Sequence, residues 1–451
     1  MSFENEKSIR LNSRAIHFKE VRSAVMQATA KPTVPAKIWR EVKRPFKKIL
    51  HLKRLFRPQA VDIHGISIAE NERANHYSCV EHLLDNNHGL SFFDKPSFPK
   101  VAQIQYKWDN LAFLFDRIEF QQFSPDSHAD MYFSWGFGDA PESRLLARTA
   151  EKKRKPLYLV EDGFLKSADT WCHTNIDKKY VNGVSFTVDD KAMYFDTTRT
   201  SRLEEMLNDE TLVVSECQKL RAKTCMEFIT ATYLTKYNHQ PICTPQIGRK
   251  GVPKVLVVDQ SYGDMSITRG LANDLTFQQM LNSAIAENPD ADIIIKTHPD
   301  TLVNSCVRSG YYTEVEMGKN LYKLTTPINP ISLLKYVDKI YACTTQLGFE
   351  ALLCGKEVHV FGMPFYAGWG LTKDRLVCPR RTHRRTLEEV FYIAYIMYSR
   401  YVNPATKTRC EIEEAMNYLL TLRAEYFEEF NVLCELDKSA DFDITTKRHV
   451  A

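Results

Sequence analysis

The stretch Lys254–Asp264, with the sequence KVLVVDQSYGD, decides the fold class of this chain. Its apolar run Val255–Val258 is typical of a strand buried on both faces, as in a parallel sheet. The polar turn that follows ends in Gly263 and Asp264, and a glycine there allows a sharp turn and leaves space beside the carboxylate. Ligands bind beyond the carboxyl ends of the strands in open α/β sheets. Asp264 is therefore either a catalytic carboxylate at a sheet edge or a cap for the next helix.

Strands and helices alternate on both sides of this stretch. The alternation predicts doubly wound parallel sheets. A polar segment with Pro and Gly, residues 238–253, separates two such series. We therefore predict an α/β fold with two Rossmann-type units that face a cleft. The strands expected around the opening stretch lie at 129–136, 156–163, 292–296, 339–343 and 357–362, and a capping box at Thr386–Glu389 opens a further helix.

These patterns divide the chain into four segments. We predict a basic, partly helical N-terminal extension at 1–100, a first Rossmann-like unit at 101–250, a second unit with terminal helices at 251–435, and a disordered tail at 436–451. Within the extension, residues 37–57 hold nine basic residues and one acid, and their apolar residues recur at steps of three and four. This segment is either an amphipathic helix that docks on an anionic membrane surface or a helix packed on the body of the protein.

Composition restricts the class of protein. The 451 residues carry a formal net charge of only +4, which does not indicate nucleic acid as a partner. The eleven cysteines are scattered without a CxxC pair, which argues against a disulfide framework and a zinc knuckle and favours a reducing compartment. The N-terminus lacks the apolar core of a signal peptide, and no apolar run approaches the roughly 20 residues that span a bilayer. We expect a cytoplasmic protein that touches a membrane at most.

Three further polar groups follow apolar strands. In Glu161-Asp162-Gly163 the adjacent carboxylates would repel, so that one of them is a candidate acid or base, although on this pattern alone a loop with a helix cap is the favoured explanation. In KTHPD, His298 is restrained by Pro299 and suits a phosphate, with Lys296 beside it as a point charge. The hydroxyls of Thr344 and Thr345 precede a helix, where they suit either an anion or simple capping.

Other features suit binding less clearly. Asp189-Asp190 is the candidate for a DxD-like metal motif, and a turn is the simpler role for it, so we predict no metal site and no cofactor. Neither GxGxxG nor GxxxxGK[ST] occurs, which argues against dinucleotide and P-loop chemistry. The basic run RRTHRR either binds an acidic acceptor or decorates a solvated surface, and we favour binding. Its arginines are Arg380, Arg381, Arg384 and Arg385.

The ordered motifs together resemble one family. They are WG at 135–136, YLVEDGFLKS at 158–167, VDDKAMYFDTTRTSRLE at 188–204, VLVVDQSYGDMSI at 255–267, ENPDADIIIKTHPD at 287–300, TTQLGFEALLCGK at 344–356 and VFGMPFYAGWGLTKDR at 360–375. The chain resembles the KpsC family of capsule polysaccharide proteins, the retaining β-Kdo transferases of Gram-negative capsule assembly, over roughly residues 130–405.

The resemblance implies a GT-B-type enzyme that uses CMP-β-Kdo without a metal to build a Kdo linker on a lysophosphatidylglycerol or other glycolipid acceptor. By position, Asp264 resembles the nucleophile that forms a covalent glycosyl adduct. Glu161 resembles the acid/base, with Asp162 supporting it. The residues implied to hold the CMP phosphate and the donor are His298, Lys296, Pro299, Thr344, Thr345 and Gln260. Expected partners are a second Kdo transferase, capsule export machinery and the anionic inner face of the inner membrane.

Two departures from the family pattern affect these expectations. The chain has one transferase module where many relatives have two, so a partner supplies the second linkage or the product needs only one. QSYGD stands where QTRGD is expected, so an arginine for the donor carboxylate is missing at Tyr262, and Arg269 is a candidate substitute. Two alternatives remain: a transferase for another surface glycan, and a non-catalytic factor of capsule assembly or export.

Overall fold

The structure is a computed structural model, and it describes residues 100–103, 109–115, 119–126, 128–136, 141–173, 176–298 and 309–435. All of them belong to one compact unit. The basic segment 37–57, the rest of the N-terminal extension up to residue 99, and the tail 436–451 lie outside these residues.

Two expectations from composition can be compared with the described residues. No helix among them is long and apolar enough to cross a membrane. Eight of their cysteines are free thiols, whereas Cys172 is disulfide-bonded, which the scattered cysteines did not predict.

The opening stretch forms β6 (Lys254–Val258), a central strand of a six-stranded sheet. Every pairing in this sheet is parallel, as expected for its alternating strands and helices. The order β8-β7-β6-β9-β10-β11 is that of a Rossmann sheet, whose direction of winding reverses between β6 and β9. A ligand site is expected beyond the carboxyl ends of these two strands. The other strands are β7 (Asp292–Lys296), β8 (Leu321–Leu324), β9 (Lys339–Ala342), β10 (Glu357–Val360) and β11 (Lys373–Asp374).

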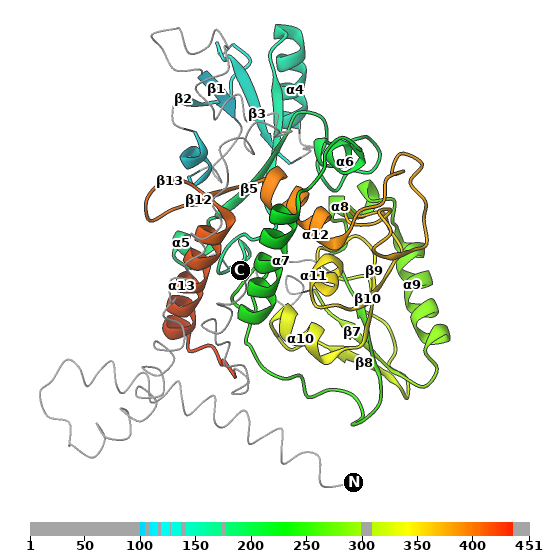
Figure 1. The fold of residues 1–451 in the computed structure, drawn as a ribbon. Coiled ribbons are helices and arrows are strands. Elements are labelled where there is room, and N and C mark those ends of the chain that lie inside the picture. The colour runs from blue at the N-terminus through cyan, green and yellow to red at the C-terminus, as the bar shows by residue number, and fades with distance from the viewer. Residues whose placement is uncertain are drawn as a thin grey trace, which may run out of the picture. The chain divides into compact units, whose positions relative to one another are not determined.

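Helices cover both faces of this sheet (Figure 1). Side chains alternate along a strand, so Val255 and Val257 pack with α9 (Asp274–Glu287) in one cluster. Leu256 and Val258 face the other way, into a cluster with α10 (Pro330–Tyr336) and α11 (Leu347–Leu353). The helix expected at Asn329-Pro330 is confirmed, because Asn329 accepts hydrogen bonds from the first turn and Pro330 opens the helix.

The first sheet differs from the expected parallel arrangement. Its order is β13-β12-β5-β4-β3-β1-β2, in which β12 is Ser399–Asn403 and β13 is Thr408–Cys410. Strands β1 to β4 are parallel, but β5 runs antiparallel to β4 and β12 runs antiparallel to β5. Gly163 permits the tight β4–β5 approach, because a Cβ on it would lie 2.4 Å from Ser185 Oγ. In chain order, the first five strands of this sheet are β1 (Lys100–Gln103), β2 (Glu119–Gln122), β3 (Met131–Trp135), β4 (Leu157–Asp162) and β5 (Ser185–Asp189).

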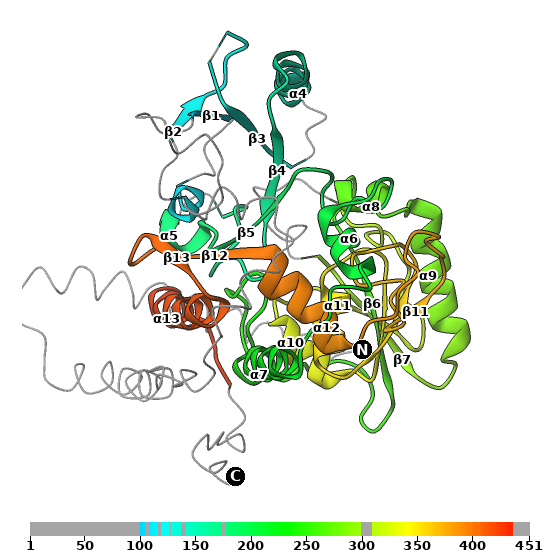
Figure 2. The same ribbon diagram turned by 45° about the horizontal axis from the view of Figure 1, so that its top comes forward.

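The C-terminal segment returns to the first sheet (Figure 2). The expected capping box is present at Thr386, but α12 (Leu387–Phe391) continues as a π-helix, η5 (Tyr392–Tyr398), and then becomes β12 (Ser399–Asn403). Strand β13 (Thr408–Cys410) and helix α13 (Ile412–Phe430) follow. The remaining helices are η3 (Leu111–Leu114), α4 (Pro141–Lys153), α5 (Lys178–Val181), α6 (Arg202–Asn208), α7 (Glu216–Thr232) and α8 (Met265–Arg269).

Candidate functional site

A pair of buried side chains spans the point where the six-stranded sheet changes direction. Gln260 follows β6 and Thr344 follows β9, and they share two hydrogen bonds of 3.0 Å: Gln260 Nε2 donates to Thr344 Oγ1, and Thr344 N donates to Gln260 Oε1. The Thr344 methyl group also fits closely against Gly270 and Gly362, where a Cβ would lie 2.5 Å and 2.7 Å from it. Thr344 is therefore a buried residue that links the segments after β6 and β9.

Thr345 is the member of the threonine pair that reaches the surface. It is partly exposed, and its hydroxyl accepts a hydrogen bond of 3.2 Å from Leu347 N. The hydroxyl proton remains able to donate to an anion. The two threonines therefore have different roles, which the sequence did not distinguish.

Asp264 combines the two roles considered for it. Its Oδ1 accepts a hydrogen bond of 2.8 Å from Ser266 N at the start of α8, so the carboxylate does cap this helix. The side chain is nevertheless partly exposed. Gly263 has a φ of +76°, and apart from its chain neighbours no atom of the described residues lies within 4 Å of the position of its missing Cβ. The carboxylate is thus held in one orientation beside an open space.

Ser266 connects Asp264 to the threonine pair. Its backbone N–H binds Asp264, and its hydroxyl lies 3.5 Å from Thr344 Oγ1. The end of β7 is joined to the same loop, because Ser261 Oγ lies 3.1 Å from His298 Nδ1. The structure therefore brings Gln260, Asp264, His298 and Thr344 together at one edge of the sheet.

Lys296 is placed differently from its expected role as a point charge for a phosphate. The side chain is buried, and its ammonium donates a 2.9 Å hydrogen bond to the carbonyl oxygen of Thr297. Burial lowers the pKa of Lys296 to about 8, although nearby Asp259 partly opposes the shift. Lys296 therefore bonds to the protein inside the sheet edge and does not project toward a ligand. Pro299 lies outside the described residues.

Glu161 and Asp162 belong to β4 itself rather than to a loop after it. Successive strand residues point to opposite faces, so the expected repulsion between two facing carboxylates does not arise in this way. Asp162 is buried and forms an ion pair of 2.7 Å with Lys166. Glu161 is partly exposed, and its Oε2 lies 3.6 Å from where a Cβ on Gly136 would be. The Trp135-Gly136 and Glu161-Asp162-Gly163 motifs therefore meet.

Gln346, which immediately precedes α11, and Glu350 within α11 join the edges of the two sheets, and sequence analysis missed both. Gln346 Nε2 donates to the carbonyl oxygen of Phe164, just after the Glu161-Asp162-Gly163 motif, at 2.8 Å. Buried Glu350 accepts a 2.6 Å hydrogen bond from Thr235 Oγ1 and one of 3.3 Å from Gln346. Both lie in the motif TTQLGFEALLCGK, so the sequence contains the signal, but the pattern assigns a role only to the hydroxyls of that motif.

Arg269 faces the first half of the molecule. Its Nη1 lies 3.3 Å from Asp196 Oδ2, and its carbonyl oxygen accepts a 2.9 Å hydrogen bond from Thr197 N. Asp196 is fully buried, so this ion pair has a structural partner. Arg269 is therefore a weaker substitute for the missing arginine than the sequence suggested.

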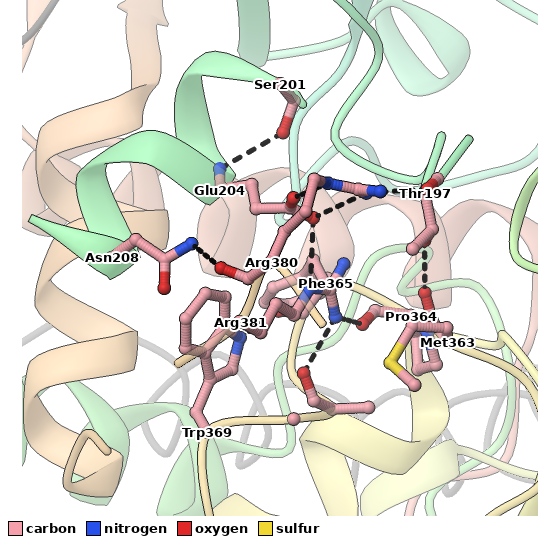
Figure 3. A network of polar contacts seen from close by, with 12 residues as sticks. Thr197, Ser201, Glu204, Asn208, Met363, Pro364, Phe365, Trp369, Arg380 and Arg381 are labelled. Atoms are coloured by element: carbon pink, nitrogen blue, oxygen red, sulfur yellow. Dashed lines mark hydrogen bonds and ion pairs between the residues drawn. The ribbon is translucent and has the colours of Figure 1, made fainter. Parts of the chain in front are cut away.

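Part of the arginine run departs from the expectation of an acceptor-binding surface, because Arg381 is bound within the fold (Figure 3). Arg381 and Glu204 are 2% and 4% exposed and lie 3.0 Å apart, and Arg381 also donates to the carbonyl oxygens of Pro364 and Ala367. Arg380 binds the same Glu204 at 2.7 Å. Buried Arg385 donates to three carbonyl oxygens in the last turn of α6 and in the segment after it, those of Leu207, Asp209 and Leu212. Arg381 and Arg385 are thus used within the fold, and Arg384 is exposed.

The Asp189-Asp190 pair has the turn role favoured from sequence. Asp189 Oδ1 accepts hydrogen bonds from Lys191 N and Ala192 N, and its Oδ2 accepts from Arg202 N and Tyr398. Asp190 forms an ion pair of 2.8 Å with Arg202. Within the described ranges, no cluster of three or more His, Cys, Asp or Glu side chains could hold a metal ion.

Comparison with known proteins gives consistent matches. The sequence profile of the family described as "Capsule polysaccharide biosynthesis protein" matches residues 135–404. The "Capsule polysaccharide modification protein LipA" of Neisseria meningitidis is 38% identical over 314 residues, which are 68% of this chain and 43% of LipA. The chain thus matches less than half the length of that relative.

Two solved structures share the fold. "Thermosulfurimonas dismutans KpsC, beta Kdo 2,4 transferase" is 34% identical, with a TM-score of 0.65, and the match covers 73% of this chain and 99% of that one. "Thermosulfurimonas dismutans KpsC, beta Kdo 2,7 transferase" is 24% identical, with a TM-score of 0.51, and the match covers 72% of this chain and 99% of that one. The expected GT-B-like arrangement of two α/β halves is confirmed.

Proposed function

Because this chain belongs to the capsule polysaccharide biosynthesis protein family, we propose that it is a retaining β-Kdo transferase that uses CMP-β-Kdo. The observation that carries the proposal is the match to a β-Kdo 2,4 transferase over 99% of that chain at 34% identity. On the same ground we propose the 2,4 linkage. The match to the 2,7 transferase is weaker and supports the fold alone.

In the first step, the Asp264 carboxylate attacks the anomeric carbon C2 of Kdo. The bond from C2 to the phosphate oxygen breaks, and CMP leaves with the electron pair. Support comes from the fixed orientation of Asp264 through Ser266 N and from the open space at Gly263. Thr345 and His298 would stabilise the departing phosphate by hydrogen bonds, which act most strongly where charge develops. We propose that this step needs no metal ion and no cofactor.

In the second step, an acceptor hydroxyl attacks C2 from the face that CMP left. The bond between C2 and Asp264 breaks, and Glu161 takes the proton of the attacking hydroxyl. Two inversions give net retention, which is why the mechanism needs a nucleophile and a separate base. The partial exposure of Glu161, with Asp162 held by Lys166 beside it, supports this division of roles.

We propose that the acceptor is a glycolipid such as a lysophosphatidylglycerol-linked Kdo chain at the inner face of the inner membrane. A second Kdo transferase and capsule export machinery would be its partners. The family supports capsule biosynthesis as the setting, whereas acceptor, partners and location rest on the resemblance. Vesicle sedimentation with anionic lipids tests the membrane part: deletion of residues 37–57 is expected to abolish binding.

The test of the mechanism is mass spectrometry of the intact protein after incubation with CMP-Kdo, generated in situ, and no acceptor. The expected result is an adduct of one Kdo residue on Asp264. Acceptor profiling then separates a lipid primer from another surface glycan. Donor binding without adduct and without turnover on any primer would instead indicate a non-catalytic assembly factor.

A further inference from the structure

An acidic sugar presents a carboxylate that a partly closed site must neutralise, because an unpaired buried charge is costly. Three cations near the two sheet edges have other partners. Lys166 is paired with Asp162 at 2.7 Å, Arg269 with Asp196 at 3.3 Å, and the Lys296 ammonium donates to a carbonyl oxygen. With tyrosine at 262, the loop of Asp264 supplies no cation either.

Lys236 is a fourth cation, and its backbone lies between the two edges. Its carbonyl oxygen accepts hydrogen bonds from Lys166 N and Ser167 N at 3.1 Å and 3.2 Å, just after the Glu161-Asp162-Gly163 motif. Its backbone N–H lies 3.4 Å from Glu350 Oε1 in α11. The residue is thus tied to the loop after β4 and to the helix that follows Thr344 and Thr345.

The Lys236 ammonium lies within electrostatic range of the candidate acid/base, as its backbone position beside the loop after β4 implies. Its charge interacts with the phenols of Tyr194 and Tyr237 and with the carboxylates of Asp162 and Glu161. Burial alone would lower the pKa of Lys236, but these four groups raise it above its ordinary value, so the ammonium stays protonated at neutral pH. The side chain is partly exposed, and its ammonium has no hydrogen bond or ion pair among the described residues.

We propose that the Lys236 ammonium binds the carboxylate of the acidic sugar in the reaction, an inference that rests on the proposed function. In Kdo the carboxyl carbon C1 is bonded directly to C2, where substitution occurs. A cation that holds C1 beside Glu161 therefore positions C2. It also offsets the repulsion between the sugar carboxylate and the carboxylates of Glu161 and Asp162. The carboxylate belongs to the donor or to an acidic sugar at the end of the acceptor, and kinetics distinguishes these sources.

The test compares Lys236→Met, which removes the charge at similar length, with Lys236→Arg, which keeps it. Lys250→Met on an exposed surface is the matched control. Three quantities are measured for each full-length protein: KM for CMP-Kdo, KM for the acceptor, and the dissociation constant of CMP by calorimetry. Lys236→Met is expected to raise the donor KM at least about tenfold, the low end for a lost hydrogen bond to a charged group. CMP affinity should change less than twofold, and Lys236→Arg should recover part of the loss.

The pattern of changes decides the outcome. A rise in acceptor KM alone supports the inference and assigns the carboxylate to the acceptor. Unchanged KM values overturn the inference. Equal losses in CMP affinity and sugar binding, together with a lower melting temperature, also overturn it. Lys236 is then a structural counter-ion. If the wild-type protein does not turn over CMP-Kdo, the proposed function fails separately. Saturation-transfer NMR with free Kdo then tests Lys236 itself, and equal signals for wild type and Lys236→Met contradict the inference.

Discussion

The edge of the six-stranded sheet and the arginine run differ in how their charged side chains are bonded to the rest of the protein. At the edge, Asp264 is partly exposed and its carboxylate makes one hydrogen bond to the described residues. In the run, Arg381 is buried and bonds to Glu204 and two carbonyl oxygens. A carboxylate that makes one hydrogen bond to the protein can still contact a substrate, whereas a buried guanidinium that is bonded to several protein groups stabilises the fold. The two regions should therefore respond to substitution in different quantities, activity in the first and stability in the second.

The largest effect is expected from Asp264→Asn. Asparagine caps a helix about as well as aspartate, so stability should change little, but the amide is not a nucleophile. Transfer from CMP-Kdo should fall at least about a thousandfold, as when other covalent nucleophiles are removed. Steady-state kinetics and urea unfolding measure the two quantities.

Asp177→Asn is the matched control, because Asp177 caps α5 through a 2.9 Å hydrogen bond from Lys179 N. It should alter neither activity nor stability appreciably. Normal turnover by Asp264→Asn would show that the carboxylate only caps its helix, and the contrast between the two regions would disappear.

Arg381→Met should have the opposite profile. It removes one member of a buried ion pair and leaves two carbonyl oxygens without their donor, which costs about 3 kcal/mol in the free energy of unfolding. Glu204 keeps Arg380 as a partner, so a larger loss is not expected. Urea unfolding measures the change, and activity per folded molecule should remain close to that of the wild type.

Exposed Arg384→Met provides the control from the same run, with an expected change within about 0.5 kcal/mol. Equal stabilities for the two variants would contradict the structural role of Arg381. A selective loss of acceptor binding in Arg381→Met would restore the binding role favoured from sequence.

The same contrast explains what the sequence could predict. The second sheet and the Asn329-Pro330 helix start were predictable, because strand burial and capping are local patterns. The partners of Arg381 were not, since Glu204 lies 177 residues away along the chain. An arginine-rich run looks the same in sequence whether water or carbonyl oxygens surround it.

Two errors in the first sheet have a similar origin. The pattern of β5 does not distinguish parallel from antiparallel pairing, which depends on the partner strand and the connection. The apolar segment after Thr386 repeats like a helix but ends as β12, because its end pairs with β5. Strand-end positions for Gln260, Asp264, His298 and Thr344 were predictable from order along the chain, whereas the burial of Lys296 and Thr344 depends on neighbouring strands.

The burial of Lys296 at the edge of the six-stranded sheet can be tested through the pH dependence of stability. Burial lowers its pKa from 10.5 to about 8, so between these values the unfolded chain binds a proton that the folded one does not. Stability linked to this group must therefore rise with pH above about 8. We expect a gain of roughly 1.5 kcal/mol between pH 8 and 9.5 relative to Lys296→Met, measured by urea unfolding across the range. Lys323→Met on the adjacent strand β8 should keep the wild-type rise, and parallel curves for wild type and Lys296→Met would contradict burial of an ionisable lysine.

The smallest effects separate two adjacent hydroxyls. Thr344→Val keeps the methyl group that fits between Gly270 and Gly362 but removes the hydroxyl bound to Gln260. The free energy of unfolding should fall by about 1 kcal/mol, since a buried amide loses one partner. Thr345→Val removes a partly exposed hydroxyl whose hydrogen bond from Leu347 N can be replaced by water, so it should lower stability by less than Thr344→Val does and raise the KM for CMP-Kdo a few-fold. If instead Thr344→Val raised the KM and Thr345→Val caused the larger loss of stability, burial would not distinguish structural from substrate-binding groups at this edge.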